Sequence, residues 1–237
     1  MRKTRWKPLR AAPTVPSSAA TCSHGGLTPS IGSLQVVRAA TDKAVMAMIR
    51  PREGGFCYTE TEFRVALSDA EALLKAGADG LVFGFLHEDG TLDTERTAQL
   101  VAMTKKAGKQ SVFHRAFDVV PDWKAAMDAL IALGVTRILT SGQEKNVTLG
   151  LDTVREMREY AAGRIEIMPG AGITLKNMDR VIETTGCSAI HLSAHRSAHD
   201  TSTRNNRDIY YGGCLYPPED VYAVTDRECV ARMAARL

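Results

Sequence analysis

The residues best suited to chemistry lie together in one short apolar segment, Ser111 to Asp118. This segment carries His114, Arg115 and Asp118 toward its carboxyl end. Burying an imidazole, a guanidinium and a carboxylate is costly unless these groups pair with each other or meet a ligand. We therefore take the three residues as candidate catalytic groups at the end of a buried strand. The alternation of side chains along a strand leaves open which of His114 and Arg115 points inward.

Similar largely apolar segments occur along the chain, and each carries Arg, His, Ser or Gly at or next to its end. They are residues 44–51, 79–87, 137–142, 165–172 and 189–193. Glycines recur between them about every 30 residues, which is the length of a strand plus a crossover helix. These glycines are Gly77, Gly108, Gly134, Gly163 and Gly186.

Strict alternation of strands and helices predicts a parallel sheet covered by helices, with the chemistry at the carboxyl ends of the strands. No Gly-x-Gly-x-x-Gly follows the first strand. We therefore expect a TIM-type (β/α) barrel with about six recognisable units rather than an open dinucleotide-binding sheet.

Signals for helix starts fill the intervals between these strands. They lie at Thr28-Pro29, at a capping box of Thr59 and Glu62, near Asp93 and Asp122, and near Val147 and Thr174. Residues 194–223 break the rhythm, and we expect a long loop over the strand ends, either a functional lid or merely mobile. A final helix from about Thr225 should bury Val230, Met233 and Leu237.

Two groups of residues could hold an anion. Gly170 and Gly172 lie between a strand and a helix start, where backbone N–H groups can face phosphate, and Ser193 ends the next strand. Arg50 and Arg52 could hold a carboxylate or phosphate. The alternatives are a plain strand-to-helix connection for the glycines and a structural salt bridge, for example to Asp118, for the arginines.

Met46 and Met48 share one face of a strand, and with Cys57 and His114 they offer the soft ligands that a cuprous ion prefers. Paired methionines also fill cores, which is the alternative for Met46 and Met48.

The bulk composition narrows the class of protein. The 237 residues are 44% hydrophobic and 24% charged, and no apolar run is long enough to span a bilayer, so we expect one soluble globular domain without a membrane partner. The net charge is +3, and residues 1–24 hold five basic residues and no acid, so the rest carries 3 − 5 = −2. Nucleic acid is therefore not an expected partner.

Five widely spaced cysteines favour reduced, intracellular thiols over a disulfide framework. The composition of residues 1–24 predicts a basic disordered extension or an atypical start from an incorrectly predicted first exon, and the alternative is an organellar transit peptide. Residues 25–237 form the predicted barrel domain.

Several ordered motifs resemble the CutC copper homeostasis family. They are Met48 to Phe56, Asp79 to Gly84, Phe113 to Asp118, Ile138 to Gly142 and Met168 to Gly172. The resemblance implies an eight-stranded TIM-type barrel, a cytoplasmic protein and a role in copper homeostasis, with copper ion binding proposed for some members.

One departure from the family pattern affects these expectations. Members open with strand, helix and strand, including early cysteines, before the turn that we match to Gly25 to Ser30. Here those first two strands are missing, with Cys22 as the only remnant. We expect weak cuprous binding, and two open sheet edges, at 44–51 and 189–193, that favour association with other copies.

The sequence thus predicts a copper homeostasis protein with an anion-binding cleft at its strand ends. It leaves open an enzyme that acts on a small phosphorylated or carboxylated metabolite, with His114 as acid or base, and also a truncated inactive product. Its expected partners are copper ion or a small anionic metabolite, and a homo-oligomer.

Overall fold

The structure is a computed structural model that describes residues 17–18, 26–213 and 215–237. Its main sheet contains six parallel strands in sequential order. The strands are β1 (Ser17–Ser18), β2 (Met46–Met48), β3 (Gly80–Phe83), β4 (Gln110–Phe113), β5 (Arg137–Thr140) and β6 (Glu166–Pro169). This alternation confirms the predicted partial (β/α) barrel.

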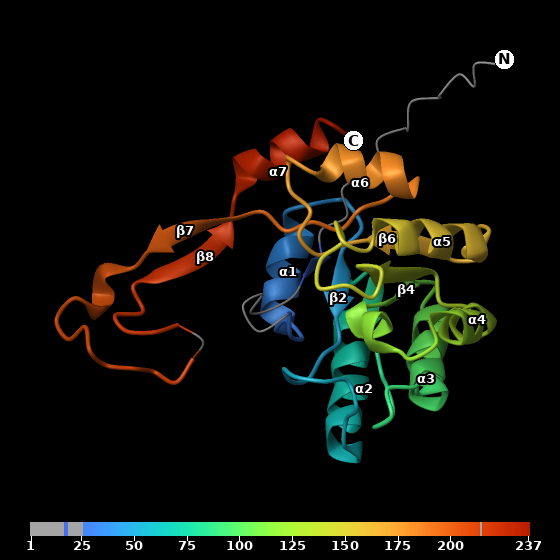
Figure 1. Cartoon of the computed structure of the whole chain (residues 1–237). Coiled ribbons are helices and arrows are strands. Elements are labelled where there is room, and N and C mark those ends of the chain that lie inside the picture. The colour runs from blue at the N-terminus through green and yellow to red at the C-terminus, as the bar shows by residue number, and fades with distance from the viewer. Residues whose placement is uncertain (1–16, 19–25, 214) are drawn as a thin grey trace, which may run out of the picture.

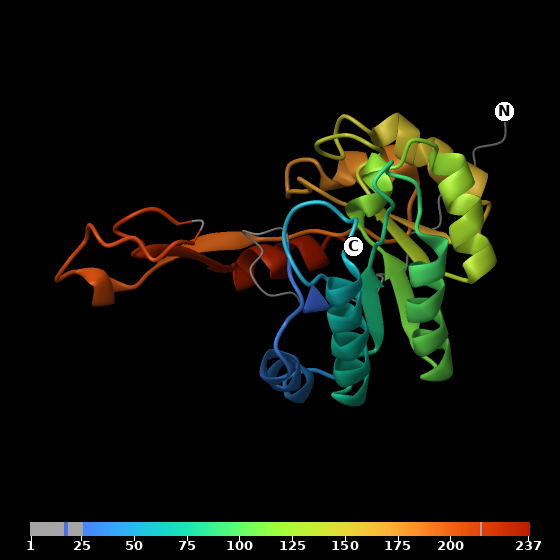
Figure 2. The same cartoon turned by 90° about the horizontal axis from the view of Figure 1, so that it is seen from below.

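Helices lie between the strands, and α2 to α5 line the outer side of the sheet in sequence order (Figures 1 and 2). The helices are α1 (Ile31–Ala39), α2 (Glu60–Lys75), α3 (Thr94–Lys106), α4 (Trp123–Leu133), α5 (Leu151–Ala161), α6 (Met178–Thr185) and α7 (Arg227–Ala234), with the short 3-10 helices η2 (Arg115–Val119) and η3 (Thr201–Thr203). None of the described helices is long and apolar enough to cross a membrane.

Alternating side chains of the strands form two apolar layers. One set faces the helices and joins the main core, as Ala47, Leu81 and Phe113 do. The other set faces the barrel interior and consists of Met46, Val82, Val112 and Leu139, with Met48 and Met168 packed against them. Met46 and Met48 therefore share a face as predicted, and they pack there as core side chains.

Some of the predicted helix caps are confirmed and one is wrong. The capping box of Thr59 and Glu62 is confirmed, as are the caps Asp93 and Asp122. Helix α1, however, begins at Ile31 with Ser30 as its cap. Thr28 cannot serve because its Oγ1 accepts a hydrogen bond from Arg50 N–H at 2.9 Å.

Two more predicted helix starts were wrong by about one turn. Helix α5 begins at Leu151, because Val147 N–H is already bound to Ala171 O at 3.0 Å. Helix α6 begins at Met178, because Thr174 N–H donates to Asn177 Oδ1 at 2.7 Å in the preceding turn.

The predicted edge strand at 189–193 was also wrong. This segment gives one hydrogen bond to β6, from His191 N–H to Pro169 O at 2.8 Å, and forms no ladder there. It continues instead into β7 (His195–His199), which pairs antiparallel with β8 (Val221–Thr225). The region predicted as a long loop therefore contains a β-hairpin, which projects away from the barrel (Figure 1). The final helix is confirmed as α7, with Met233 buried.

At the other edge, the prediction that residues 44–51 form an open edge of the sheet was wrong. Ser17 and Ser18 pair with Met46 and Ala47 of β2. The prolines of the amino-terminal segment all precede the two paired residues in the sequence, so none interrupts the pairing. The rest of the predicted extension over residues 1–24, including Cys22, lies outside the described residues.

Candidate functional site

The inner face of the barrel ends in polar side chains at the carboxyl ends of β2 and β4. Met48, Val82 and Val112 are neighbours in the sheet register. The next inward positions, two residues further along each strand, are Arg50, Gly84 and His114. Arg50 and His114 are 7% and 4% exposed, so both polar groups are buried at this end of the barrel.

His114 fits there because Gly84 has no side chain. A Cβ on Gly84 would lie 2.4 Å from His114 Cε1, so any larger residue would displace the imidazole. The ring of Phe56 covers the other side, with its centroid 4.9 Å from that of His114. The neighbouring strand and the loop after β2 therefore fix the imidazole.

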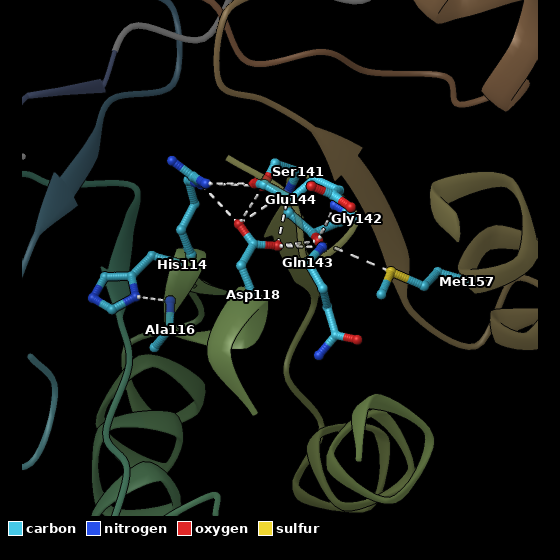
Figure 3. Close-up of polar contacts among 10 residues, drawn as sticks. His114, Ala116, Asp118, Ser141, Gly142, Gln143, Glu144 and Met157 are labelled. Carbon is cyan, nitrogen blue, oxygen red and sulfur yellow. Dashed lines mark hydrogen bonds and ion pairs between the residues drawn. The ribbon is translucent and has the colours of Figure 1, made fainter. Parts of the chain in front are cut away.

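The backbone also fixes the tautomer of His114. Ala116 N–H donates to Nδ1 at 3.1 Å (Figure 3), so the proton of a neutral ring must sit on Nε2. Nε2 is buried and has no hydrogen-bond partner in the described part of the chain. A buried N–H without an acceptor is costly, and a ligand oxygen would satisfy it.

Burial lowers the pKa of His114 to about 3, and the positive charge of Arg50 acts in the same direction. The imidazole is therefore neutral at physiological pH. It can donate a hydrogen bond from Nε2, but in this tautomer Nε2 cannot accept a proton or bind a metal.

Arg50 brings a positive charge to the same place. Its Nη2 donates to Gly54 O at 2.7 Å, and its guanidinium carbon lies 5.3 Å from the centre of the Phe56 ring. Phe56 thus contacts both Arg50 and His114. A cation and a neutral donor converge at this end of the barrel, an arrangement that suits a carboxylate or another oxyanion.

Asp118 has a different environment from the other two candidates. Its Oδ1 accepts from Thr140 Oγ1 at 2.5 Å and Ser141 N–H at 2.9 Å, and its Oδ2 accepts from Arg115 Nε at 2.7 Å and Ser141 Oγ at 2.9 Å. These contacts join η2 to the end of β5 (Figure 3). A carboxylate with this many donors holds the strand ends together and has little capacity left for a substrate.

Arg115 lies at the edge of this network, 40% exposed. Besides Asp118, its Nη2 donates to Ser141 Oγ at 2.8 Å and Glu144 O at 3.3 Å. The side chain that points to the barrel interior at the end of β4 is therefore His114, and Arg115 pairs with Asp118 toward β5.

Arg52 stabilises the loop after β2. Its Nε donates to Glu62 Oε1 at 2.6 Å, its Nη2 donates to Cys57 O at 2.7 Å, and its guanidinium carbon lies 4.8 Å from the Tyr58 ring centre. Arg52 thus forms a structural salt bridge, which was the alternative to anion binding, but its partner is Glu62 of α2 and not Asp118 or another residue of a neighbouring strand. This places the charge of Arg52 on the cap of α2.

The loop with Gly170 and Gly172 offers fewer free backbone N–H groups for an anion than the sequence predicts. Gly170 N–H already donates to Thr140 O at 2.9 Å within the sheet. Gly172 is exposed, with its carbonyl bound to Asn177 Nδ2 at 2.9 Å, and Ser193 is exposed beyond β6. Because α6 starts only at Met178, the glycines do not open directly onto a helix N-terminus.

His191 is a site residue that sequence reasoning missed. Its Cβ would lie 3.2 Å from a Cβ on Gly170, so it packs over the inward-facing end of β6. Burial lowers the pKa of His191, and the charge of Arg115 adds to this. The available signal was a histidine inside the apolar segment 189–193, at the position where the other segments end in polar residues.

The soft residues named as copper candidates differ in their exposure. Met46 is 3% exposed within the inner layer, whereas Cys57 lies exposed on the loop after β2. The tautomer of His114 directs an N–H, not a lone pair, toward the interior. Across the described residues, no group of three or more His, Cys, Asp or Glu side chains is arranged to hold a metal ion.

Comparisons with known proteins agree with this barrel. The model of the CutC family matches residues 17–196. A CutC family protein of Treponema denticola is 52% identical over 83% of this chain and 79% of its own length. The copper homeostasis protein cutC homolog of Homo sapiens is 42% identical over 86% of this chain and 74% of its own length.

A solved structure shows the same fold. The putative copper homeostasis protein CutC of Streptococcus agalactiae superposes with a TM-score of 0.71 and 35% identity, over 75% of this chain and 87% of that one. The resemblance read from the sequence motifs is therefore confirmed. The chain belongs to the CutC family.

Proposed function

We propose that this protein acts in copper homeostasis by binding a small carboxylate or other oxyanion at the carboxyl end of its barrel. The named relatives support the cellular role. The observation that supports the ligand class is the unpartnered, buried Nε2–H of His114, whose ring shares the neighbour Phe56 with the buried Arg50. A ligand oxygen would accept from Nε2 while its charge is neutralised by Arg50.

Thermal unfolding with a panel of phosphate, sulfate and small carboxylates tests this proposal. A ligand at 100 times its Kd stabilises the native state by about 2.7 kcal/mol. For a protein of this size such a gain raises Tm by roughly 5–10 °C. At least one of these anions should produce that increase in the wild-type protein.

Two variants assign the effect to the site. His114→Phe removes the donor and should abolish the increase in Tm. Arg50→Met should weaken the affinity for the anion at least tenfold. His87→Gln and Arg64→Gln change exposed residues of the same types and should leave the increase unchanged. Binding that survives both site substitutions would place the anion elsewhere, for example at Gly170, Gly172 and Ser193.

For copper itself, we propose only weak binding of cuprous ion. Soft ligands determine Cu(I) affinity, and Met46, Met48 and Cys57 differ widely in burial. A competition titration should show weak binding that Cys57→Ser barely changes. Tight one-to-one binding abolished by substituting these residues and His114 would establish a copper centre instead.

An enzyme that acts on a small phosphorylated or carboxylated metabolite is the second candidate. A neutral histidine that donates a hydrogen bond can polarise a substrate carbonyl, and the position at the carboxyl ends of barrel strands is where such chemistry occurs. In this role His114 would stabilise developing negative charge rather than act as acid or base. Turnover of a ligand that also raises Tm, lost in His114→Phe, would support this function.

We also place the protein in the cytoplasm. Cys57, Cys187 and Cys229 are free thiols, as expected in a reducing compartment. Fractionation of cells that express the full chain would test this location, and recovery in an organelle would favour the transit-peptide alternative for residues 1–24.

A further inference from the structure

A second buried donor, the hydroxyl of Tyr58, has no hydrogen-bond partner. Tyr58 is 4% exposed, and no acceptor or donor among the described residues is bonded to its Oη. A buried hydroxyl that exchanges its water partners for nothing destabilises the fold, so such a group needs an explanation. The Tyr58 hydroxyl shares this condition with Nε2 of His114.

The loop after β2 brings Tyr58 to the end of the barrel where Arg50 and His114 lie. Phe56, whose ring contacts both of these residues, precedes Tyr58 by two positions on this loop. Burial raises the pKa of Tyr58, and the charge of Arg50 opposes this rise, so the guanidinium lies close to the phenol. The hydroxyl therefore keeps its proton at physiological pH and can donate it in a hydrogen bond.

The packing around the Tyr58 ring fixes the place of its hydroxyl. The ring makes an edge contact with Phe85, at a centroid distance of 5.8 Å. Phe85 directly follows Gly84, the glycine that makes room for the imidazole of His114. The guanidinium carbon of Arg52 lies 4.8 Å from the centre of the Tyr58 ring. Contacts with β3 and with its own loop thus hold the ring beside the proposed ligand site.

The charges around this site indicate which oxyanion fits. Arg52 Nε lies 2.6 Å from Glu62 Oε1. Arg115 Nε lies 2.7 Å from Asp118 Oδ2. Acids of the chain itself therefore compensate these two arginines, and of the three only Arg50 can neutralise a ligand. A carboxylate brings a single negative charge, whereas sulfate brings a second charge that would be buried without compensation.

A carboxylate also matches the two neutral donors. It offers one oxygen to the O–H of Tyr58 and the other to the Nε2–H of His114. We infer that Tyr58 is a third ligand-binding residue, which with His114 and Arg50 makes the site selective for a carboxylate over sulfate or phosphate. The inference rests on the proposed function, because it concerns the same site.

Tyr58→Phe tests this role, since it removes one oxygen atom and keeps the ring. Titration calorimetry with acetate, pyruvate and succinate, and with sulfate and phosphate, gives the affinities. In the wild type at least one carboxylate should bind at least tenfold more tightly than sulfate or phosphate. Tyr58→Phe should weaken binding of that carboxylate at least tenfold. Tyr216→Phe, at a tyrosine that is 83% exposed on the hairpin, is the matched control and should not change it.

Thermal unfolding without ligand distinguishes a ligand-binding hydroxyl from a structural one. Because the Tyr58 hydroxyl has no partner among the described residues, Tyr58→Phe should leave the Tm of the ligand-free protein unchanged or raise it. The increase in Tm that the carboxylate produces in the wild type should nevertheless be smaller in the variant. A clear fall in the Tm of the ligand-free variant would show that the hydroxyl is bonded within the chain, and this would overturn the inference.

The remaining outcomes separate this inference from the proposed function. If a carboxylate binds and His114→Phe abolishes the binding while Tyr58→Phe does not weaken it, the proposed function holds and the role of Tyr58 is wrong. Tighter binding of sulfate or phosphate than of every carboxylate would overturn the selectivity. If none of these anions binds the wild type, the proposed function fails and the inference fails with it.

Discussion

The barrel and the arm, which is the β-hairpin of residues 195–225, differ in how far their strand residues are buried. In the barrel, strand residues alternate between the layer that faces the helices and the inner layer, and most residues of β2 to β6 are buried. In the arm, both faces of β7 and β8 meet solvent. The barrel strands are therefore stabilised by burial on both faces, whereas the strands of the arm bury little side-chain surface.

The carboxylates of the barrel and the arm also differ in their exposure. Asp118 in the barrel is 6% exposed and accepts from several donors, whereas Asp220 in the arm is 22% exposed and pairs with an Arg207 that is 59% exposed. Removing a buried carboxylate is costly because its donors are left without an acceptor, whereas exposed ion pairs contribute little. The comparison predicts that equivalent substitutions will have unequal effects in the two regions.

The largest effect should come from Asp118→Ala. It leaves the buried donors of Thr140 and Ser141 without their acceptor and separates η2 from the end of β5, so the free energy of unfolding should fall by roughly 3–5 kcal/mol. Urea unfolding of this variant should be compared with Asp220→Ala, for which the loss should stay below about 1 kcal/mol. Equal losses in the two variants would remove the distinction between barrel and arm.

The next effect concerns pH. The pKa of His114 is about 3 in the folded protein, below its ordinary value of 6.5, so between these values the unfolded chain binds the proton and the native state does not. Stability from this group is therefore complete above about pH 6.5 and falls as the pH drops toward 3. The loss should be roughly 3–5 kcal/mol at about 1.4 kcal/mol per pH unit. His114→Phe should flatten the unfolding free energy over this window, and an unchanged slope would argue against a buried neutral imidazole.

A smaller effect is expected from Gly84→Ala. The new Cβ would lie 2.4 Å from His114 Cε1 and 2.8 Å from Ala116 Cβ, so the imidazole must move. Overpacking of this kind costs about 1–3 kcal/mol. Gly55→Ala is the control, because a Cβ there meets nothing within 4 Å. If both variants melt alike, Gly84 is not the position that seats His114.

The smallest effect on folding should come from the arm itself. Tyr211→Ser changes a side chain that is 66% exposed, and in the dilute protein the free energy of unfolding should change by less than about 0.5 kcal/mol. A loss of several kcal/mol in urea unfolding at low concentration would show that the arm packs within its own chain.

The sequence predicted the barrel well because its signals are local. Apolar strands, capping residues such as Asp93 and Asp122, and glycines at helix ends each act within a few residues. The role of Asp118 could not be predicted in the same way, since its partners Thr140 and Ser141 follow more than twenty residues later. Its assignment depended on tertiary pairing of two strand ends.

The predictions for residues 189–193 and for the arm were wrong for related reasons. Residues 189–193 have the composition of a strand, yet the chain leaves β6 after one hydrogen bond. The arm was taken for a loop because β7 carries His, Arg and Ser rather than an apolar face, and its partner β8 begins more than twenty residues later. The pairing of β7 with β8 is thus a contact between distant segments, and no local sequence pattern predicts it.

The protonation state of His114 is the most direct test of this account. In a protein labelled with ¹⁵N at histidine, long-range proton–nitrogen spectra distinguish the two neutral tautomers and the imidazolium. We predict a neutral ring with its proton on Nε2 from pH 8 to below pH 5, with the Nε2 signal shifting when the stabilising oxyanion is added and His87 as the exposed reference. A ring that becomes charged near pH 6.5, or one protonated on Nδ1, would contradict the proposal that His114 donates a hydrogen bond to the ligand.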